Sequence, residues 1–103
     1  MPTPIPISIS VNIDVGNITV DPSLVYASPG SSVAWTAKNG TSLTISFKNQ
    51  SPFSTYQLRS QSNSLSATMD QSTAKGIYHY AVAIMGTDGK IYTIPGCPEI
   101  IVQ

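Results

Sequence analysis

The chain has 103 residues, a formal net charge of zero and only 10% charged residues, where about 25% is typical. Its five basic side chains are spread along the sequence, so the clustered positive charge that nucleic-acid binding requires is missing. No stretch approaches the length of a membrane span, and the N-terminus lacks the basic and apolar regions of a signal peptide. These features exclude nucleic-acid and membrane partners and predict a single domain over residues 1–103. As written the domain is expected to be cytoplasmic, and the alternatives are export by another route or a leader that has been removed.

The first part of the sequence alternates apolar and polar residues with the period of two that is typical of half-buried strands. This pattern covers residues 7–15 and 18–20 and ends before Pro22, because proline lacks a backbone N–H donor. A short extended piece is predicted at residues 24–26, and a turn at residues 28–31, where Pro and Gly favour turn geometry.

Residues 32–47 are predicted to form a β-hairpin. Both flanking segments alternate, and Asn39-Gly40 between them is the dipeptide that most favours a two-residue hairpin turn. The apolar side chains of this hairpin are expected to face the core: Val33, Trp35, Leu43, Ile45 and Phe47.

The segment of residues 49–75 is rich in Ser, Gln and Thr and shows no clear period, so it is predicted to be one long polar loop. Its candidate anchors to the core are Leu58, Leu65 and Met69. The spacing of the last two allows a single helical turn.

Two aromatic rings and a guanidinium lie close together in this loop, at Phe53, Tyr56 and Arg59. Aromatic and arginine side chains are enriched at binding hot spots, and loops held by a rigid sandwich are common contact surfaces. We therefore predict that a partner binds there through these three residues. The alternative is that Phe53 and Tyr56 fold back as lids that seal the core.

Alternation resumes in residues 76–84, a turn at residues 86–89 leads back into residues 91–93, and residues 99–102 form the last strand. About seven short strands separated by turns predict an all-β, Greek-key β-sandwich. Trp35 and most of the tyrosines are expected to belong to its core: Tyr26, Tyr78, Tyr80 and Tyr92.

Three segments carry a resemblance to a known family. They are Ile18-Thr19-Val20-Asp21-Pro22 followed by residues 26–35, Asn39 followed by Leu43-Thr44-Ile45-Ser46-Phe47, and Gly76-Ile77-Tyr78-His79-Tyr80. On these segments, and on the closing strand, the chain resembles the cupredoxins, the small blue-copper domains and their copper-free relatives. The resemblance covers most of the chain and implies a cupredoxin-like fold.

The copper ligands of that family are missing from the matching positions. A blue-copper site needs two histidines, a cysteine thiolate and usually an axial methionine. Leu43 stands where the first histidine is expected and Val82 where the cysteine is expected, and His79 is the only histidine. The resemblance therefore implies the fold without copper, and we expect no metal or other cofactor.

His79 and Cys97 are the remaining candidates for chemistry. His79 alternates with two tyrosines that are expected to point inward, so it is predicted to be an exposed sheet residue. Cys97 is the only cysteine and has no activating neighbour in the sequence. A small metal-binding or thiol-dependent protein that uses both residues is one alternative function.

No serine lies in a G-x-S-x-G or S-x-x-K motif, and no catalytic set of residues is found, so the chain is predicted not to be an enzyme. The leading interpretation is a binding or structural module whose partner is another protein or a second copy of the chain, because a net charge near zero permits self-association. A neutral, hydroxyl-rich surface with loop aromatics also suits a carbohydrate-binding module, which is the other alternative.

Overall fold

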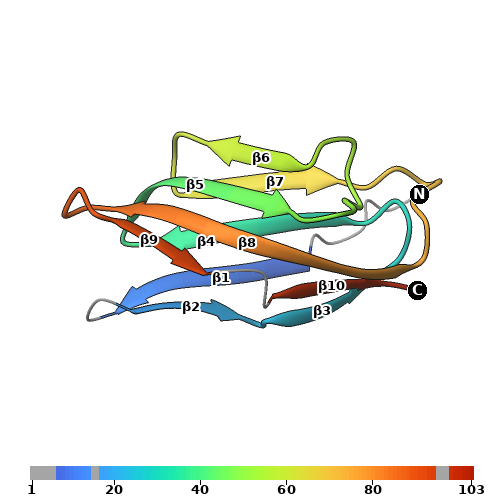
Figure 1. The fold of residues 1–103 in the computed structure, drawn as a ribbon, viewed down its shortest axis with the longest axis horizontal. Coiled ribbons are helices and arrows are strands. Elements are labelled where there is room, and N and C mark those ends of the chain that lie inside the picture. The colour runs from blue at the N-terminus through green and yellow to red at the C-terminus, as the bar shows by residue number, and fades with distance from the viewer. Residues whose placement is uncertain (1–6, 15–16, 95–97) are drawn as a thin grey trace.

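The computed structural model describes residues 7–14, 17–94 and 98–103 of the chain. Over these ranges the chain forms ten strands arranged in two mixed sheets that pack face to face, so the prediction of an all-β sandwich is confirmed (Figure 1). None of the described residues forms a helix that could cross a membrane.

The two sheets are called sheet I, with the strand order β2-β1-β4-β7, and sheet II, with the order β3-β10-β8-β5-β6 and β9 also paired to β8. Sheet I contains β1 (Ile7–Asp14), β2 (Asn17–Asp21), β4 (Ser32–Lys38) and β7 (Ser64–Thr68). Sheet II contains β3 (Leu24–Ala27), β5 (Gly40–Phe47), β6 (Gln57–Ser60), β8 (Gly76–Gly86), β9 (Ile91–Ile94) and β10 (Glu99–Val102). Two pairs are parallel, β1 with β4 and β3 with β10, and the other paired strands are antiparallel.

The ten strands exceed the predicted seven mainly because residues 49–75 are not one polar loop. This segment contains β6, which pairs with β5, and β7, which pairs with β4. Both strands lie at sheet edges, where even the inward side chains are only half-buried, so few apolar residues mark them. Leu65 lies in β7 opposite Trp35, so the helical turn is wrong, whereas the anchoring role predicted for Met69 is confirmed by its burial.

The predicted hairpin of residues 32–47 is also wrong, because β4 and β5 belong to different sheets. Asn39 has a φ of 65° and carries the chain from sheet I across to sheet II. Only glycine fits next to it, since a Cβ on Gly40 would lie 2.8 Å from Cγ2 of Ile84. The inward face of both strands is predicted correctly, however, and all five of the residues assigned to it are buried.

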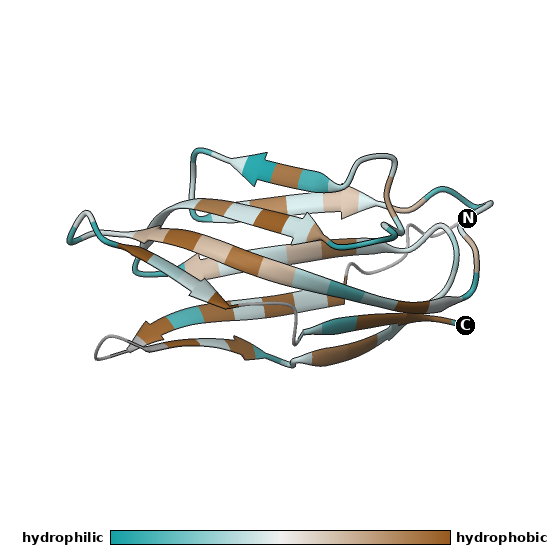
Figure 2. Ribbon diagram, viewed as in Figure 1, coloured by the Kyte–Doolittle hydropathy of each residue, from teal (hydrophilic) through white to brown (hydrophobic). Residues whose placement is uncertain are grey.

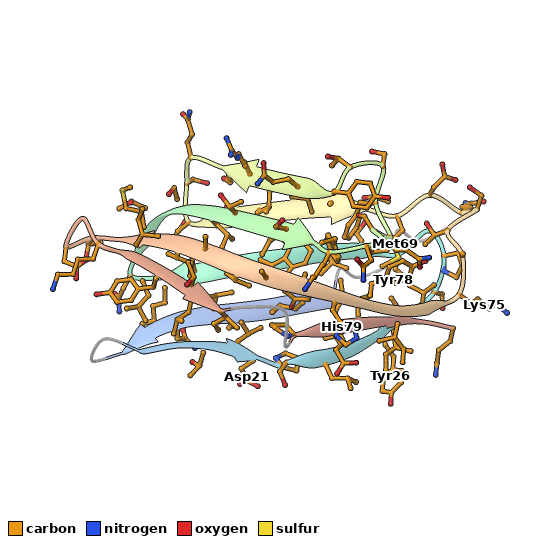
Figure 3. The ribbon with its side chains drawn as sticks, in the orientation of Figure 1. Asp21, Tyr26, Met69, Lys75, Tyr78 and His79 are labelled. Atoms are coloured by element: carbon orange, nitrogen blue, oxygen red, sulfur yellow. The ribbon has the colours of Figure 1, made fainter. Side chains whose placement is uncertain are left out.

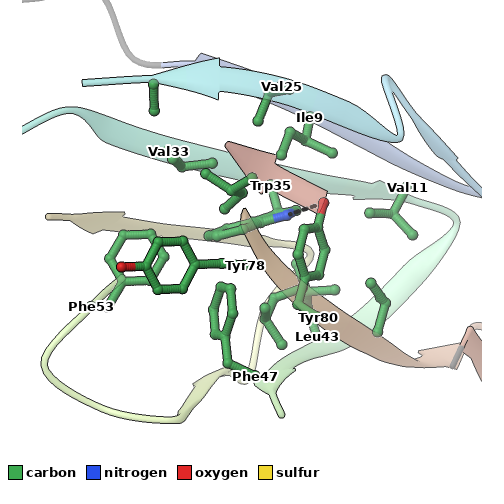
Figure 4. Close-up of a cluster of buried hydrophobic side chains, with 14 of the residues drawn as sticks. Ile9, Val11, Val25, Val33, Trp35, Leu43, Phe47, Phe53, Tyr78 and Tyr80 are labelled. Carbon is green, nitrogen blue, oxygen red and sulfur yellow. Dashed lines mark hydrogen bonds between the residues drawn. The ribbon is translucent and has the colours of Figure 1, made fainter. Parts of the chain in front are cut away.

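Aromatic side chains from both sheets meet at the centre of the core (Figure 4). The ring of Trp35 lies edge-on to the ring of Tyr80, with centroids 5.7 Å apart, and its Nε1 donates a hydrogen bond to the Tyr80 hydroxyl at 3.3 Å. Phe47 packs against Tyr80, and Phe53 packs against both Trp35 and Phe47. Burial raises the pKa of the Tyr80 phenol, which therefore stays neutral at physiological pH.

Replacing Trp35 with alanine is expected to lower the free energy of unfolding by about 3–5 kcal/mol, because it removes a fully buried indole and leaves the Tyr80 hydroxyl without its donor. Urea unfolding followed by circular dichroism measures this loss. Ile91→Ala is the control, since Ile91 is 67% exposed and its truncation should change stability by less than about 0.5 kcal/mol. Equal losses in the two variants would contradict the central position of Trp35.

Candidate functional site

The structure divides the three predicted contact residues of the 49–75 segment between the core and the surface. Phe53 is 8% exposed and belongs to the aromatic core, so for this residue the alternative of a lid is confirmed. Tyr56 is 58% exposed. Arg59 lies on β6 with its Cα paired to Thr44, on the solvent side of sheet II. Tyr56 and Arg59 therefore remain the two exposed members of the predicted set, and the proposal that they contact a partner stays a prediction.

A hollow of about 380 Å³ lies next to Tyr56, between residues 50–56 and residues 70–74. We call it the Tyr56 hollow. The hydroxyl of Thr73 donates a hydrogen bond to the carbonyl of Pro52 at 3.0 Å and so ties its two walls together. Beneath them the Tyr78 hydroxyl donates to the carbonyl of Ala74. The rim is therefore held in place although it consists of irregular chain.

The Tyr56 hollow carries a carboxylate, that of Asp70. The backbone N–H and the hydroxyl of Ser72 both donate to its Oδ1 at 3.0 Å. These hydrogen bonds hold the pKa of Asp70 below its usual value, because they stabilise the charged form. The hollow thus combines an exposed aromatic ring, an ionised carboxylate and the amide of Gln50.

A second candidate surface is the solvent side of sheet II where β3, β10 and β8 lie next to one another. The Cα atoms of Tyr26, Ile101 and Ile77 are register partners in one row across the three strands, and those of Leu24, Glu99 and His79 form the neighbouring row. We call these six residues the apolar face. Figure 3 labels Tyr26 and His79, which lie close together toward the right of the view.

Three of the four large apolar or aromatic side chains of the apolar face are exposed. Tyr26 and Ile77 are 59% and 56% exposed and Leu24 is 39% exposed. The expectation that Tyr26 is a core residue is therefore wrong, whereas the exposure predicted for His79 is confirmed. Figure 2 shows β4 and β5 in alternating bands but most of β10 in continuous brown.

Sequence reasoning missed the apolar face although a signal for it was present. Leu24-Val25-Tyr26 and Ile100-Ile101-Val102 are runs of three consecutive large apolar or aromatic residues in short strands. Because successive side chains point to opposite faces of a sheet, such a run places large side chains on both faces. Only one of those faces can belong to the core of a two-layer sandwich.

A larger hollow of about 500 Å³ adjoins the apolar face. It opens beside the first residues of β8, because β5 ends at Phe47, level with Tyr80, and leaves this stretch of β8 without a neighbour on that side. We call it the β8 hollow. Lys48 and Asn49 line it on one side and Ile77 and His79 on the other.

The two positions that the cupredoxin resemblance assigns to copper ligands lie inside the core. Leu43 and Val82 are each 1% exposed, on the adjacent strands β5 and β8. Among the described residues there is no group of three or more His, Cys, Asp or Glu side chains that could hold a metal ion. Cys97 lies outside the described residues, so the alternative that joins it to His79 stays a prediction.

No protein-family model and no curated protein sequence matches this chain. The likeness to the cupredoxins therefore stays an interpretation of the sequence pattern, and functional reasoning starts from the two hollows and the apolar face.

Adding Cu(II) to the purified chain is expected to give no intense visible absorption and no one-to-one complex, because aliphatic side chains fill both core positions. Absorption spectroscopy and metal analysis after desalting measure this. Weak, colourless binding that disappears in His79→Ala is the most that a lone exposed imidazole should produce. A stoichiometric blue complex would contradict the prediction.

Proposed function

We propose that this chain is a non-enzymatic binding domain, a Greek-key, cupredoxin-like sandwich without copper, which recognises a protein through its apolar face. The fold supports this assignment in two ways. The chain leaves sheet II after β6, forms β7 in sheet I and returns as β8 beside β5, a connection of the kind used in Greek-key sandwiches. The three segments that resemble the cupredoxins run through β2, β3, β4, β5 and β8, which all contribute side chains to the core or pack against it.

The observation that carries the proposal is the exposure of Tyr26 and Ile77 on neighbouring strands. Folding does not require these side chains, because the same strands supply the core from their other face. Val25 in β3, Tyr78 in β8 and Ile100 in β10 are all buried there. Large apolar side chains gathered on a solvent-facing surface mark interaction sites in soluble proteins.

The shape of this surface favours a protein over a small molecule. Sites for small ligands are concave and enclose most of the ligand, whereas a sheet face offers a broad contact area. The row of Tyr26, Ile101 and Ile77 is entirely apolar or aromatic, and the neighbouring row joins Leu24 to the polar residues Glu99 and His79. Protein interfaces likewise combine apolar and aromatic side chains with polar groups.

The double substitution Tyr26→Ser/Ile77→Ser tests this function. We expect the free energy of unfolding to change by less than about 0.5 kcal/mol, because neither side chain serves the core. Binding of the apolar dye ANS to the dilute folded protein should fall strongly, because the accessible apolar surface is lost.

Ile91→Ser is the matched control, since Ile91 is an exposed isoleucine on β9, away from this face. It should leave dye binding unchanged. A large loss of stability in the double variant would show that the face is structural, and unchanged dye binding would show that it is not a binding surface.

The Tyr56 hollow favours carbohydrate binding as a second candidate function. The C–H groups on one side of a sugar ring pack against exposed aromatic side chains, and Tyr56 offers such an aromatic ring. The carboxylate of Asp70 and the amide of Gln50 supply an acceptor and a mixed donor and acceptor for sugar hydroxyls.

A glycan array separates the two functions. If the hollow is a sugar site, the protein should bind a defined set of glycans, and Tyr56→Ala should abolish that binding because it removes the stacking platform. Tyr26→Ala is the matched control, since the two tyrosines are equally exposed at 58% and 59% but only Tyr56 lines this hollow. An empty array would exclude this second candidate.

A further inference from the structure

We propose that the partner of the apolar face is a second copy of this chain, and that the two copies pack face to face about a twofold axis running between β10 and β8. This inference rests on the proposed function and names the partner. It follows from the arrangement of the face, which becomes complementary to itself when it is turned about that axis.

Four positions lie side by side across this part of sheet II: β3, β10, β8 and the β8 hollow. Neighbouring strands are about 4.8 Å apart, so the midpoint between β10 and β8 is also the midpoint of all four positions. The proposed twofold axis runs parallel to the strands through this midpoint and lies in the plane between the two copies. Rotation about this axis places β10 of one copy over β8 of the other. It likewise places β3 over the β8 hollow.

The rotation brings opposite chemistries together in the first row. Glu99 and His79 are register partners at the same height along the strands. The axis therefore sets Glu99 of each copy over His79 of the other, and the pair forms twice. In the next row Ile101 of each copy lies over Ile77 of the other, which buries the apolar centre of the face.

The same rotation places Tyr26 of each copy over a cavity of the other copy. Its ring is 59% exposed on β3, in the row of Ile77. The rotation carries it over the β8 hollow of the other copy, which Ile77 lines together with Lys48 and Asn49. The ammonium of Lys48 can contact the face of the tyrosine ring, an attraction available to Lys and aromatic pairs.

The net charge permits self-association, and edge geometry disfavours one competing self-contact, that through the free edge of β3. The chain has a net charge of zero, so two copies approach without long-range repulsion. Pairing through the free edge of β3 is less suited, because the strand has only four residues and lies between Pro22 and Pro29. Packing of aligned sheets through their faces has no such limit.

Sedimentation velocity over a concentration series tests the proposal. The face is defined by six residues, whereas a standard interface has about 20–30 residues on each side, so a reversible dimer that dissociates on dilution is expected. Ile77→Lys should sediment as a monomer at every concentration, because it places a charge in the apolar centre. Ile91→Lys, the matched control on β9, should behave like the parent chain.

A mixture of two charge variants tests the axis itself. Glu99→Lys alone replaces the carboxylate that faces His79 with an ammonium that has no carboxylate partner, and His79→Glu alone sets two carboxylates opposite each other, so each variant should be monomeric. In an equimolar mixture Lys at position 99 of one chain faces Glu at position 79 of the other, and the second contact is the native His79 and Glu99 pair. The mixture should therefore form a heterodimer with an affinity near that of the parent dimer.

The outcomes separate this inference from the proposed function. A parent chain that stays monomeric, a dimer that Ile91→Lys disrupts equally, or a mixture that stays monomeric would each overturn the twofold pairing. If the twofold pairing is overturned but the apolar face still binds the dye, the proposed function stands with another protein as the partner. If the face does not bind the dye either, the twofold pairing and the proposed function are both wrong. Should Ile77→Lys fail to fold, Tyr26→Lys with Tyr56→Lys as its control gives the same comparison.

Discussion

The contact between Trp35 and Tyr80 is the interaction on which the rest of the sandwich depends. Trp35 comes from sheet I and Tyr80 from sheet II, and their rings meet edge to face while the indole N–H donates to the phenol oxygen. Each side chain therefore supplies apolar area to the core and satisfies a polar atom of the other, which is the condition under which Trp and Tyr can be fully buried. Phe53 closes the same cluster from irregular chain, so the rim of the Tyr56 hollow is fixed to the core.

The position of Tyr80 also determines what the sheet presents to solvent. With Tyr78 and Tyr80 turned inward, the pleat of β8 turns Ile77 and His79 outward. β10 and β3 pair beside this stretch in a register that aligns their own outward side chains with those two residues. The apolar face is therefore a direct consequence of how the core is filled, and a shift of one residue in β8 would exchange core and surface.

The sequence pattern predicts the inward side of most strands but not their neighbours. Alternation correctly places Val33, Leu43 and Ile45 in the core, because the period of two depends only on the pleat. It cannot show whether Asn39-Gly40 folds a strand back onto its neighbour or across to the other sheet, since both paths use a positive φ. Among the candidate sites, Tyr56 can be predicted from the sequence because its residue type alone marks it. The apolar face cannot be predicted in this way, because it is formed by the register between strands that lie far apart in the chain.

The apolar filling of the core and the proposed binding surface have the same physical basis. A metal site inside a small sandwich needs polar ligands among core residues, and each must be paired with the metal because unpaired buried polar groups are costly. Leu43 and Val82 instead complete an apolar core. The side chains on the inner faces of both sheets are buried in that core and are not accessible to a partner. Any partner must therefore bind the outer faces or the ends of the sandwich. The outer face of sheet II carries large apolar side chains that the core does not require, at β3, β10 and the first half of β8.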